Sequence, residues 1–244
     1  MVNIYSDSEY PIREAIVRAH ADTLASYSAP GTWWSGAQRS AIVAEARAAR
    51  CAAGLQEPSE NGEANAVHAD LPEAARRVAR QVAVSSNDLD RTFFDQALSD
   101  GLRDTEYLET VGIVACVSGM DVFARGIGVP PRKLAPPASG EPSRKRPESA
   151  RAEGAWPETV PGGRRGGQDA IAAYGSNAVE AAPFIYRALS LVPADARALI
   201  QLAVAQYLEI ENFMNLDFTY EPDISRAQVE LLAARVSAIN QCFY

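Results

Sequence analysis

The residues best suited to chemistry are scarce in this chain, which has three cysteines, Cys51, Cys116 and Cys242, and two histidines, His20 and His68. The cysteines are odd in number and far apart, so they predict no disulfide framework. Two histidines are too few for most zinc sites, and they make a Ser-His-Asp or Cys-His arrangement hard to build. The chemistry that remains is that of a thiolate, which attacks electrophiles and is itself oxidised.

Cys242 follows a segment with a strong helical signature. Ser225 opens an S-x-A-Q pattern. In such a capping box the serine side chain accepts from the third helical amide, and the glutamine side chain accepts from the backbone N–H of the serine. The apolar residues cover much of the expected helix, which predicts a helix buried among others: Ile224, Leu231, Leu232, Ala234, Val236 and Ile239. The same pattern begins at Ser35, 16 residues before Cys51, against 17 residues from Ser225 to Cys242. This repeated pattern favours a chain made of two related halves.

The rest of the chain also has the period of helices. Spacings of three and four between apolar residues predict a helix within 8–27. A second predicted helix starts at Asp104, as its N-cap, and stops at Gly126. Pro193 occupies a first-turn position of another. Alternating strand patterns are sparse, so we expect an all-α fold.

Composition changes between Pro130 and Asp169. This stretch holds eight of the 15 prolines, six of the 16 glycines, and eight basic against five acidic residues. Such a sequence disfavours a helix or a central strand and reads as a linker. The expected organisation is a helical half over 1–129, a linker over 130–169, and a second helical half over 170–244.

The last 21 residues, ISRAQVELLAARVSAINQCFY from Ile224 to Tyr244, resemble the signature helix of the alkylhydroperoxidase D-like (carboxymuconolactone decarboxylase) superfamily. The segments LSLVP at 189–193 and WWSGAQR at 33–39 are similar to its peroxidase-related branch. The resemblance covers most of the chain outside the linker and is most specific over 190–244. It implies an alkylhydroperoxidase D-like helical bundle.

The resemblance also implies a redox site. Family members continue from this helix as C-x-x-C followed by a histidine, so Cys242 matches the first cysteine. Glu230, twelve residues upstream, matches the acid that relays protons to the pair. The second redox residue would come directly after Tyr244, and we expect selenocysteine there, because its UGA codon is read as a stop by ordinary gene calling. In the first half Ser40 stands where Glu230 stands in the second, which suggests that the half over 1–129 is degenerate.

The function that this resemblance implies is reduction of a peroxide or a disulfide by a thiol or selenol, with an external thiol as reductant and no metal or other cofactor. The 244 residues hold one member of the pair, so we expect this form by itself not to turn over. Two alternatives stay open: a non-catalytic helical scaffold or binding protein, and a non-redox decarboxylase-type member of the superfamily.

The net charge and the search for targeting signals limit the expected partners and location of the protein. The formal net charge is −8, from 23 basic and 31 acidic residues, which disfavours nucleic acid or an anionic membrane as a partner. The first residues lack the basic and apolar regions of a signal peptide, and no apolar run approaches the roughly 18 residues needed to cross a bilayer. We expect a cytoplasmic protein and, by the family resemblance, a homo-oligomer.

Overall fold

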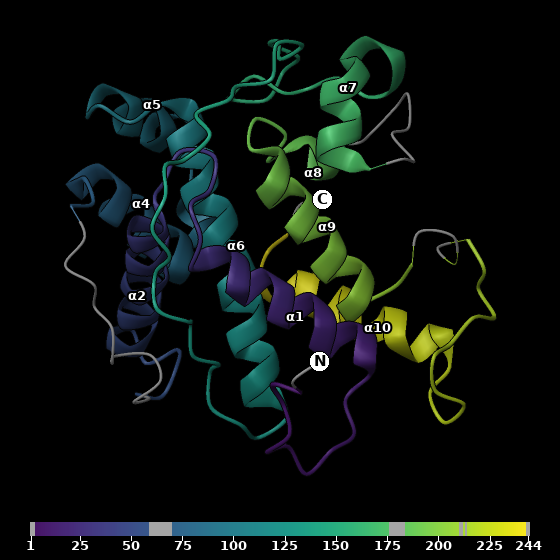
Figure 1. The fold of residues 1–244 in the computed structure, drawn as a ribbon. Coiled ribbons are helices and arrows are strands. Elements are labelled where there is room, and N and C mark those ends of the chain that lie inside the picture. The colour runs from purple at the N-terminus through teal and green to yellow at the C-terminus, as the bar shows by residue number, and fades with distance from the viewer. Residues whose placement is uncertain (1–2, 59–69, 176–183, 210–211, 213, 243–244) are drawn as a thin grey trace. The chain divides into compact units, whose positions relative to one another are not determined.

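The computed structural model describes residues 3–58, 70–175, 184–209, 212 and 214–242. The fold is all-α, as predicted, and no β-strand occurs among these residues; Arg151 and Thr159 form an isolated antiparallel bridge. The helices are α1 (Glu14–Tyr27), α2 (Gly36–Ala52), α4 (Glu73–Val84), η1 (a 3₁₀ turn, Ser86–Asp88), α5 (Arg91–Ser99), α6 (Asp104–Gly126), α7 (Gly163–Tyr174), α8 (Phe184–Arg187), α9 (Pro193–Gln206) and α10 (Arg226–Ile239) (Figure 1).

The chain forms two compact units, Met1–Leu202 and Ala203–Tyr244, and α9 crosses from one into the other. These units do not follow the boundaries expected at 129 and 170, because residues 130–202 belong to the same unit as the N-terminal helices. The relation between two halves therefore stays a prediction.

The core of the first unit forms around α6, which packs against α1, α2, α4 and α5, with α2 and α4 also in close contact (Figure 1). Small and branched apolar side chains let these helices approach closely. The centre of the core is fully buried and includes Ile42, Val43, Val78, Ile113, Val114 and Val117.

By length and composition α6 would also pass for a membrane-spanning helix, a candidate that reading the sequence missed. Two observations favour a core helix instead. Its most apolar window is 67% buried inside the protein. It also carries two buried carboxylates, Glu109 and Asp121, and each is paired with an arginine of α2. Buried charges paired in this way are typical of a packed protein interior.

The helices considered in the sequence begin and end at or near the predicted residues. Arg103, not Asp104, is the N-cap of α6, because the Glu106 side chain accepts from the Arg103 backbone N–H at 2.9 Å. The helix stops at Gly126, as predicted. The helix expected within 8–27 begins at Glu14, after Pro11 and Arg13.

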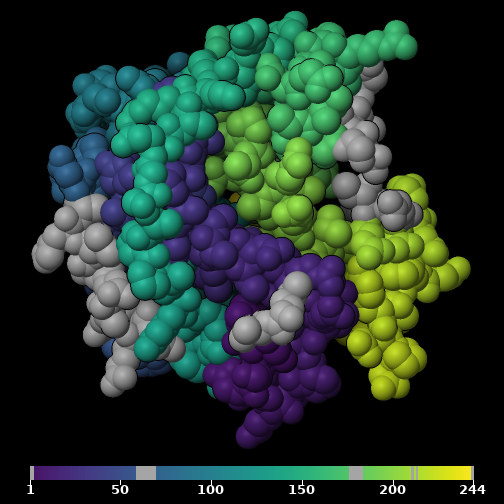
Figure 2. Space-filling view, viewed as in Figure 1, coloured from purple at the N-terminus to yellow at the C-terminus, as the bar shows by residue number. Residues whose placement is uncertain are grey.

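The proline-rich stretch from Pro130 is a strap bound to the loop between α1 and α2. Ser28 donates through its hydroxyl to the Ala135 carbonyl at 2.8 Å, and its own carbonyl accepts from the Ala138 N–H at 2.6 Å. Further along, the Arg144 N–H donates to the Thr32 carbonyl at 2.7 Å. In Figure 2 this teal segment runs across the purple N-terminal residues. The strap satisfies backbone groups that a flexible linker would leave to water.

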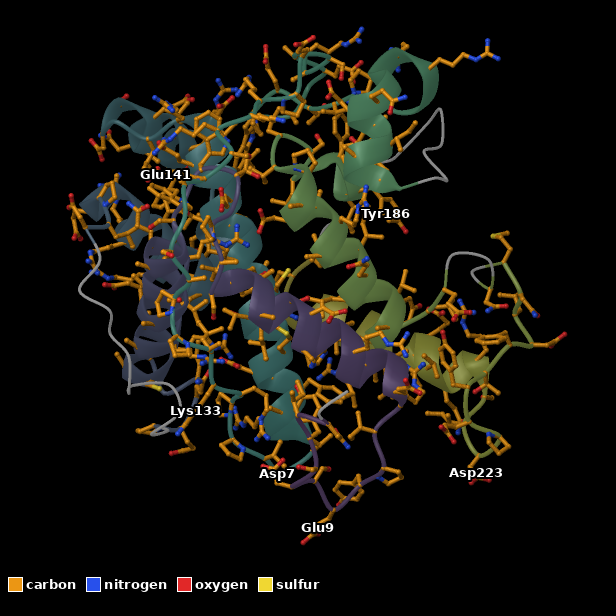
Figure 3. All side chains as sticks on the ribbon, in the orientation of Figure 1. Asp7, Glu9, Lys133, Glu141, Tyr186 and Asp223 are labelled. Carbon is orange, nitrogen blue, oxygen red and sulfur yellow. The ribbon has the colours of Figure 1, made fainter. Side chains whose placement is uncertain are left out.

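The strap is also anchored where it leaves α6. The Arg132 guanidinium donates to Asp7, labelled in Figure 3, at 2.8 Å, and to the Ile4 carbonyl at 2.9 Å. Lys133, the next residue, is labelled in the same figure. The prediction that 130–169 disfavours a helix is wrong at its end, because α7 begins at Gly163, inside this range.

In the second unit α10 starts with the predicted capping box. The side chains of Ser225 and Gln228 each accept a hydrogen bond from the other residue's backbone N–H. The expectation of a buried helix is wrong. The apolar side chains of α10 are mostly exposed: Leu231 at 69%, Leu232 at 61%, Val236 at 56% and Ile239 at 61%. Periodicity gives the width of an apolar face but not what covers it.

A buried ion pair joins α2 to α6. The Arg47 guanidinium donates to both Asp121 oxygens at 2.8 Å, and both side chains are at most 4% exposed. Arg47 also donates to the Arg132 carbonyl at 3.0 Å. This bidentate geometry compensates the cost of removing both charges from water.

We expect Asp121→Ala to destabilise the protein by about 3–5 kcal/mol, because it leaves the Arg47 guanidinium buried without its carboxylate. Urea unfolding at neutral pH measures the change. The matched control is Asp95→Ala, which breaks the exposed Arg91–Asp95 pair and should cost less than about 1 kcal/mol. Equal losses in the two variants would contradict the importance of the buried pair.

Candidate functional site

Cys242, the predicted redox residue, lies just beyond the C-terminus of α10. Asn240 is the C-cap, and Gln241 adopts a left-handed conformation with φ of 52°. The Cys242 N–H then donates to the Ser237 carbonyl at 2.9 Å, as in a Schellman-type helix end. The chain thus turns at the motif and leaves the cysteine exposed. Phe243 and Tyr244, the rest of the motif, lie outside the described residues.

The other two thiols are less accessible. Cys116 is buried in the core, and burial raises the pKa of its thiol to about 12. Cys51 is half-buried, and its thiol donates to the Glu57 carbonyl oxygen at 3.6 Å. Since a thiolate is the reactive form, Cys242 is the best placed of the three cysteines for redox chemistry.

Glu230, the predicted proton relay, is held in a hydrogen-bonded cluster. The Tyr207 hydroxyl lies 2.6 and 2.7 Å from its two oxygens, and the Arg226 Nε donates to it at 2.6 Å. The hydrogen bond from Tyr207 and then that from Arg226 lower the pKa of Glu230. Arg226 itself is buried and also donates to the Asn212 carbonyl at 3.3 Å. The cluster fixes an ionised carboxylate on α10.

The structure does not bring Glu230 and Cys242 together. Cys242 folds back only as far as Ser237, and seven residues of α-helix separate Ser237 from Glu230, a rise of about 10 Å. A proton relay between them needs a group in between, so the role of Glu230 stays a prediction.

The first unit contains a buried charged cluster that reading the sequence missed. Arg39 of α2 donates to Glu109 Oε1 of α6 and, at 3.1 Å, to Asp195 Oδ1 in the first turn of α9. The three side chains are 3%, 0% and 1% exposed. The Tyr27 ring lies against the guanidinium, with its centroid 5.2 Å away. We call Arg39, Glu109 and Asp195 the buried triad.

Local structure places each member of the triad. The Ser35–Gln38 capping box starts α2 so that Arg39 faces inward from its first turn. The loop before it folds onto α6, where the Trp33 N–H donates to Glu109 Oε2 at 2.6 Å. Gly31 lies so close to the Arg39–Glu109 pair that a Cβ there would be 1.8 Å from Arg39 Nη1. Only glycine lets the backbone approach to this distance.

Burial dominates the electrostatics of the triad. It raises the pKa of Glu109 to about 7, an effect that the Asp195 charge increases and that Arg39 opposes. Burial also raises the pKa of Asp195 against the attraction of Arg39. For Arg39 burial works against the charge, but the two carboxylates outweigh it and raise its pKa. The triad carries one positive and two negative charges when both carboxylates are ionised.

A cavity of about 540 Å³ adjoins the triad, and both Arg39 and Asp195 line it. Residues of α1, α7 and α9 line it, together with the loop before α2. Two buried polar atoms of the triad have no hydrogen-bond partner, Arg39 Nε and Asp195 Oδ2. Unsatisfied buried polar atoms are rare in proteins and call for a physical explanation such as water, an ion or a ligand.

One signal in the sequence could have revealed the triad. Glu109 stands in the apolar stretch of α6, and Arg39 begins the helical period that continues through Ile42, Val43 and Ala46. A charge on the inward face of a helix predicts a buried partner. Among the described residues, no group of histidine, cysteine, aspartate and glutamate could hold a metal ion.

Comparison with protein-family models, with curated proteins and with solved structures gave no match to this chain.

We expect Gly31→Ala to destabilise the protein by about 1–3 kcal/mol, because its Cβ would overlap the Arg39–Glu109 pair. The control is Gly119→Ala in α6, where a Cβ would meet nothing within 4 Å and the gain in helix propensity should stabilise by about 0.5–1 kcal/mol. Thermal unfolding measures both. A Gly31→Ala variant that is as stable as the native protein, or more stable, would contradict the close approach at Gly31.

The raised pKa of Glu109 predicts how stability depends on pH. Between its ordinary value of 4.5 and about 7, the folded protein holds a proton that the unfolded chain has released. The contribution of Glu109 to stability therefore falls as pH rises through this window. Relative to Glu109→Gln, the native protein should lose unfolding free energy mainly between about pH 4.5 and about pH 7.

The control for this measurement is Asp7→Asn. The hydrogen bond from Arg132 lowers the pKa of Asp7, so its contribution is lost as pH falls and has the opposite sign. A stability difference between the native protein and Glu109→Gln that stays constant with pH would contradict the shift at Glu109.

Proposed function

We propose that this protein is a peroxide-reducing oxidoreductase of the alkylhydroperoxidase type, with Cys242 as one member of a redox pair. The observation that carries the proposal is the exposed Cys242 thiol at a turned helix end, in a chain whose other thiols are half-buried or buried. The resemblance over 190–244 supports it, because it identifies the same cysteine. The substrate is a peroxide or a disulfide, and an external thiol regenerates the pair.

The chemistry needs two members. A thiolate or selenolate attacks the O–O bond of ROOH, takes one oxygen as the sulfenic or selenenic acid, and releases ROH after proton transfer. The second member then attacks the oxidised atom, forms the S–S or S–Se bond and releases water. An external dithiol reduces that bond. By the family pattern, the residue directly after Tyr244 attacks the peroxide and Cys242 resolves it.

In the full pair Cys242 would resolve, but of the three thiols in these 244 residues it is the exposed one, so it is the thiol that peroxide reaches. A single thiol can complete only the first step. We therefore expect hydrogen peroxide to convert Cys242 in the 244-residue chain to sulfenic acid stoichiometrically, with no catalytic consumption of peroxide. Dimedone trapping followed by peptide mass spectrometry measures the oxidation. Label should fall at Cys242 and disappear in Cys242→Ser, while Cys51→Ser should leave it unchanged. Preferential labelling of Cys51 or Cys116, or none at Cys242, would contradict the assignment.

The gene itself tests the expected partner. In the nucleotide sequence after the Tyr244 codon, UGA followed in frame by a histidine codon within about one helical turn and by a stem-loop would support a selenocysteine pair. A different stop codon, or UGA with no coding continuation, would favour the non-catalytic scaffold or binding protein.

A further inference from the structure

We propose that the cavity beside the buried triad is a binding site for a small primary alkylammonium ion, whose ammonium group donates to Asp195 Oδ2 and whose chain lies along the apolar wall. This inference goes beyond the proposed redox chemistry, because it concerns the first unit and involves neither Cys242 nor Glu230.

One carboxylate oxygen beside the cavity is an unsatisfied acceptor. Asp195 lines the cavity, its side chain is 1% exposed, and its Oδ2 has no hydrogen-bond partner while Oδ1 accepts from Arg39. Leaving a carboxylate oxygen buried without a donor is costly. A donor in the cavity would remove this cost, and an ammonium group would do so with a charge-assisted hydrogen bond.

The charges of the triad do not balance when both carboxylates are ionised. Arg39 supplies one positive charge to the two carboxylates of the triad, which leaves one negative charge in excess. Asp22 of α1 and Arg197 of α9 also line the cavity, and their opposite charges cancel; the Arg197 guanidinium donates to the carbonyls of Ile171 and Ala172. An anion or a neutral group would leave the excess negative charge in place. A monovalent cation neutralises it.

The volume and the lining of the cavity suit a small aliphatic ligand. A volume of about 540 Å³ falls within the range of small-molecule sites. Apart from the charged groups the wall is made of short polar side chains, Thr23, Ser26 and Gln201, and of small apolar ones. The apolar part consists of Ala29, Pro30, Ala172, Pro193, Ala194 and Ala198. Such a wall suits a short aliphatic chain better than an aromatic ring.

Protons compete with this ligand. The raised pKa of Glu109 shows that the triad can neutralise its excess charge by taking up a proton. The charged or titratable groups that face Glu109 and the triad are Tyr27 of α1, Arg39 of α2, Cys116 of α6 and Asp195 of α9. Ammonium binding should therefore weaken as pH falls below about 7, by up to about tenfold per pH unit.

The test is titration of the full chain with butylammonium chloride at constant ionic strength near pH 8, followed by NMR chemical shifts and by calorimetry. Sodium butyrate and 1-butanol are the matched probes. We expect saturable binding of butylammonium alone, in the millimolar range or tighter. The affinity should fall about tenfold or more in Asp195→Asn and should stay unchanged in the exposed control Asp88→Asn.

Ala198→Leu keeps the triad intact and fills the cavity, so it should abolish binding even if Asp195→Asn fails to fold. Three outcomes would overturn the proposal. They are saturation by butyrate or butanol instead, unchanged affinity in Ala198→Leu, and no saturation by butylammonium up to tens of millimolar, which would mean that the cavity holds water only. Because none of these readouts involves a thiol, they remain distinct from the tests of Cys242.

Discussion

The buried guanidinium of Arg39 is the constraint around which the first unit is organised. A charge that is 3% exposed persists only when carboxylates compensate it, and here they come from α6 and α9. The contact therefore requires α2, α6 and α9 to converge. It also requires the Gly31 backbone to pass so close that a side chain there has no room. One charged residue thus sets the approach of three helices and of a loop.

A second buried arginine repeats this solution. Arg47 lies two turns after Arg39 on α2 and takes both oxygens of Asp121, farther along α6. The two pairs fix the register of α2 on α6, since sliding either helix by one turn would leave a guanidinium without its carboxylate. They also explain why α6, although apolar enough to resemble a membrane helix, packs as the central helix of a protein core.

The two units offer different chemistry. The first encloses its reactive groups, where low dielectric raises the pKa of Glu109 and leaves Asp195 with an unused acceptor. The second exposes its groups: Cys242 lies beyond a helix end, and Glu230 stays ionised through Tyr207 and Arg226. Burial favours selective binding of a ligand that replaces lost hydrogen bonds, whereas exposure favours reaction with a small oxidant and with an external thiol.

The sequence by itself determined the all-α class, both capping boxes, the stop at Gly126 and the start at Pro193, because these depend on interactions within one helical turn. Cys242 and Glu230 were singled out by the family resemblance, and their roles stay predictions. Only the tertiary structure decided what is buried: α10 exposes the apolar face that periodicity predicted to be covered, and the proline-rich stretch is bound as a strap. The sequence can mark Arg39 and Glu109 as charges on inward helix faces, but it does not show which residues pair with them, since Arg39 and Asp195 stand 156 positions apart. Whether a charge is buried and paired depends on such distant partners, and local propensity carries no information about them.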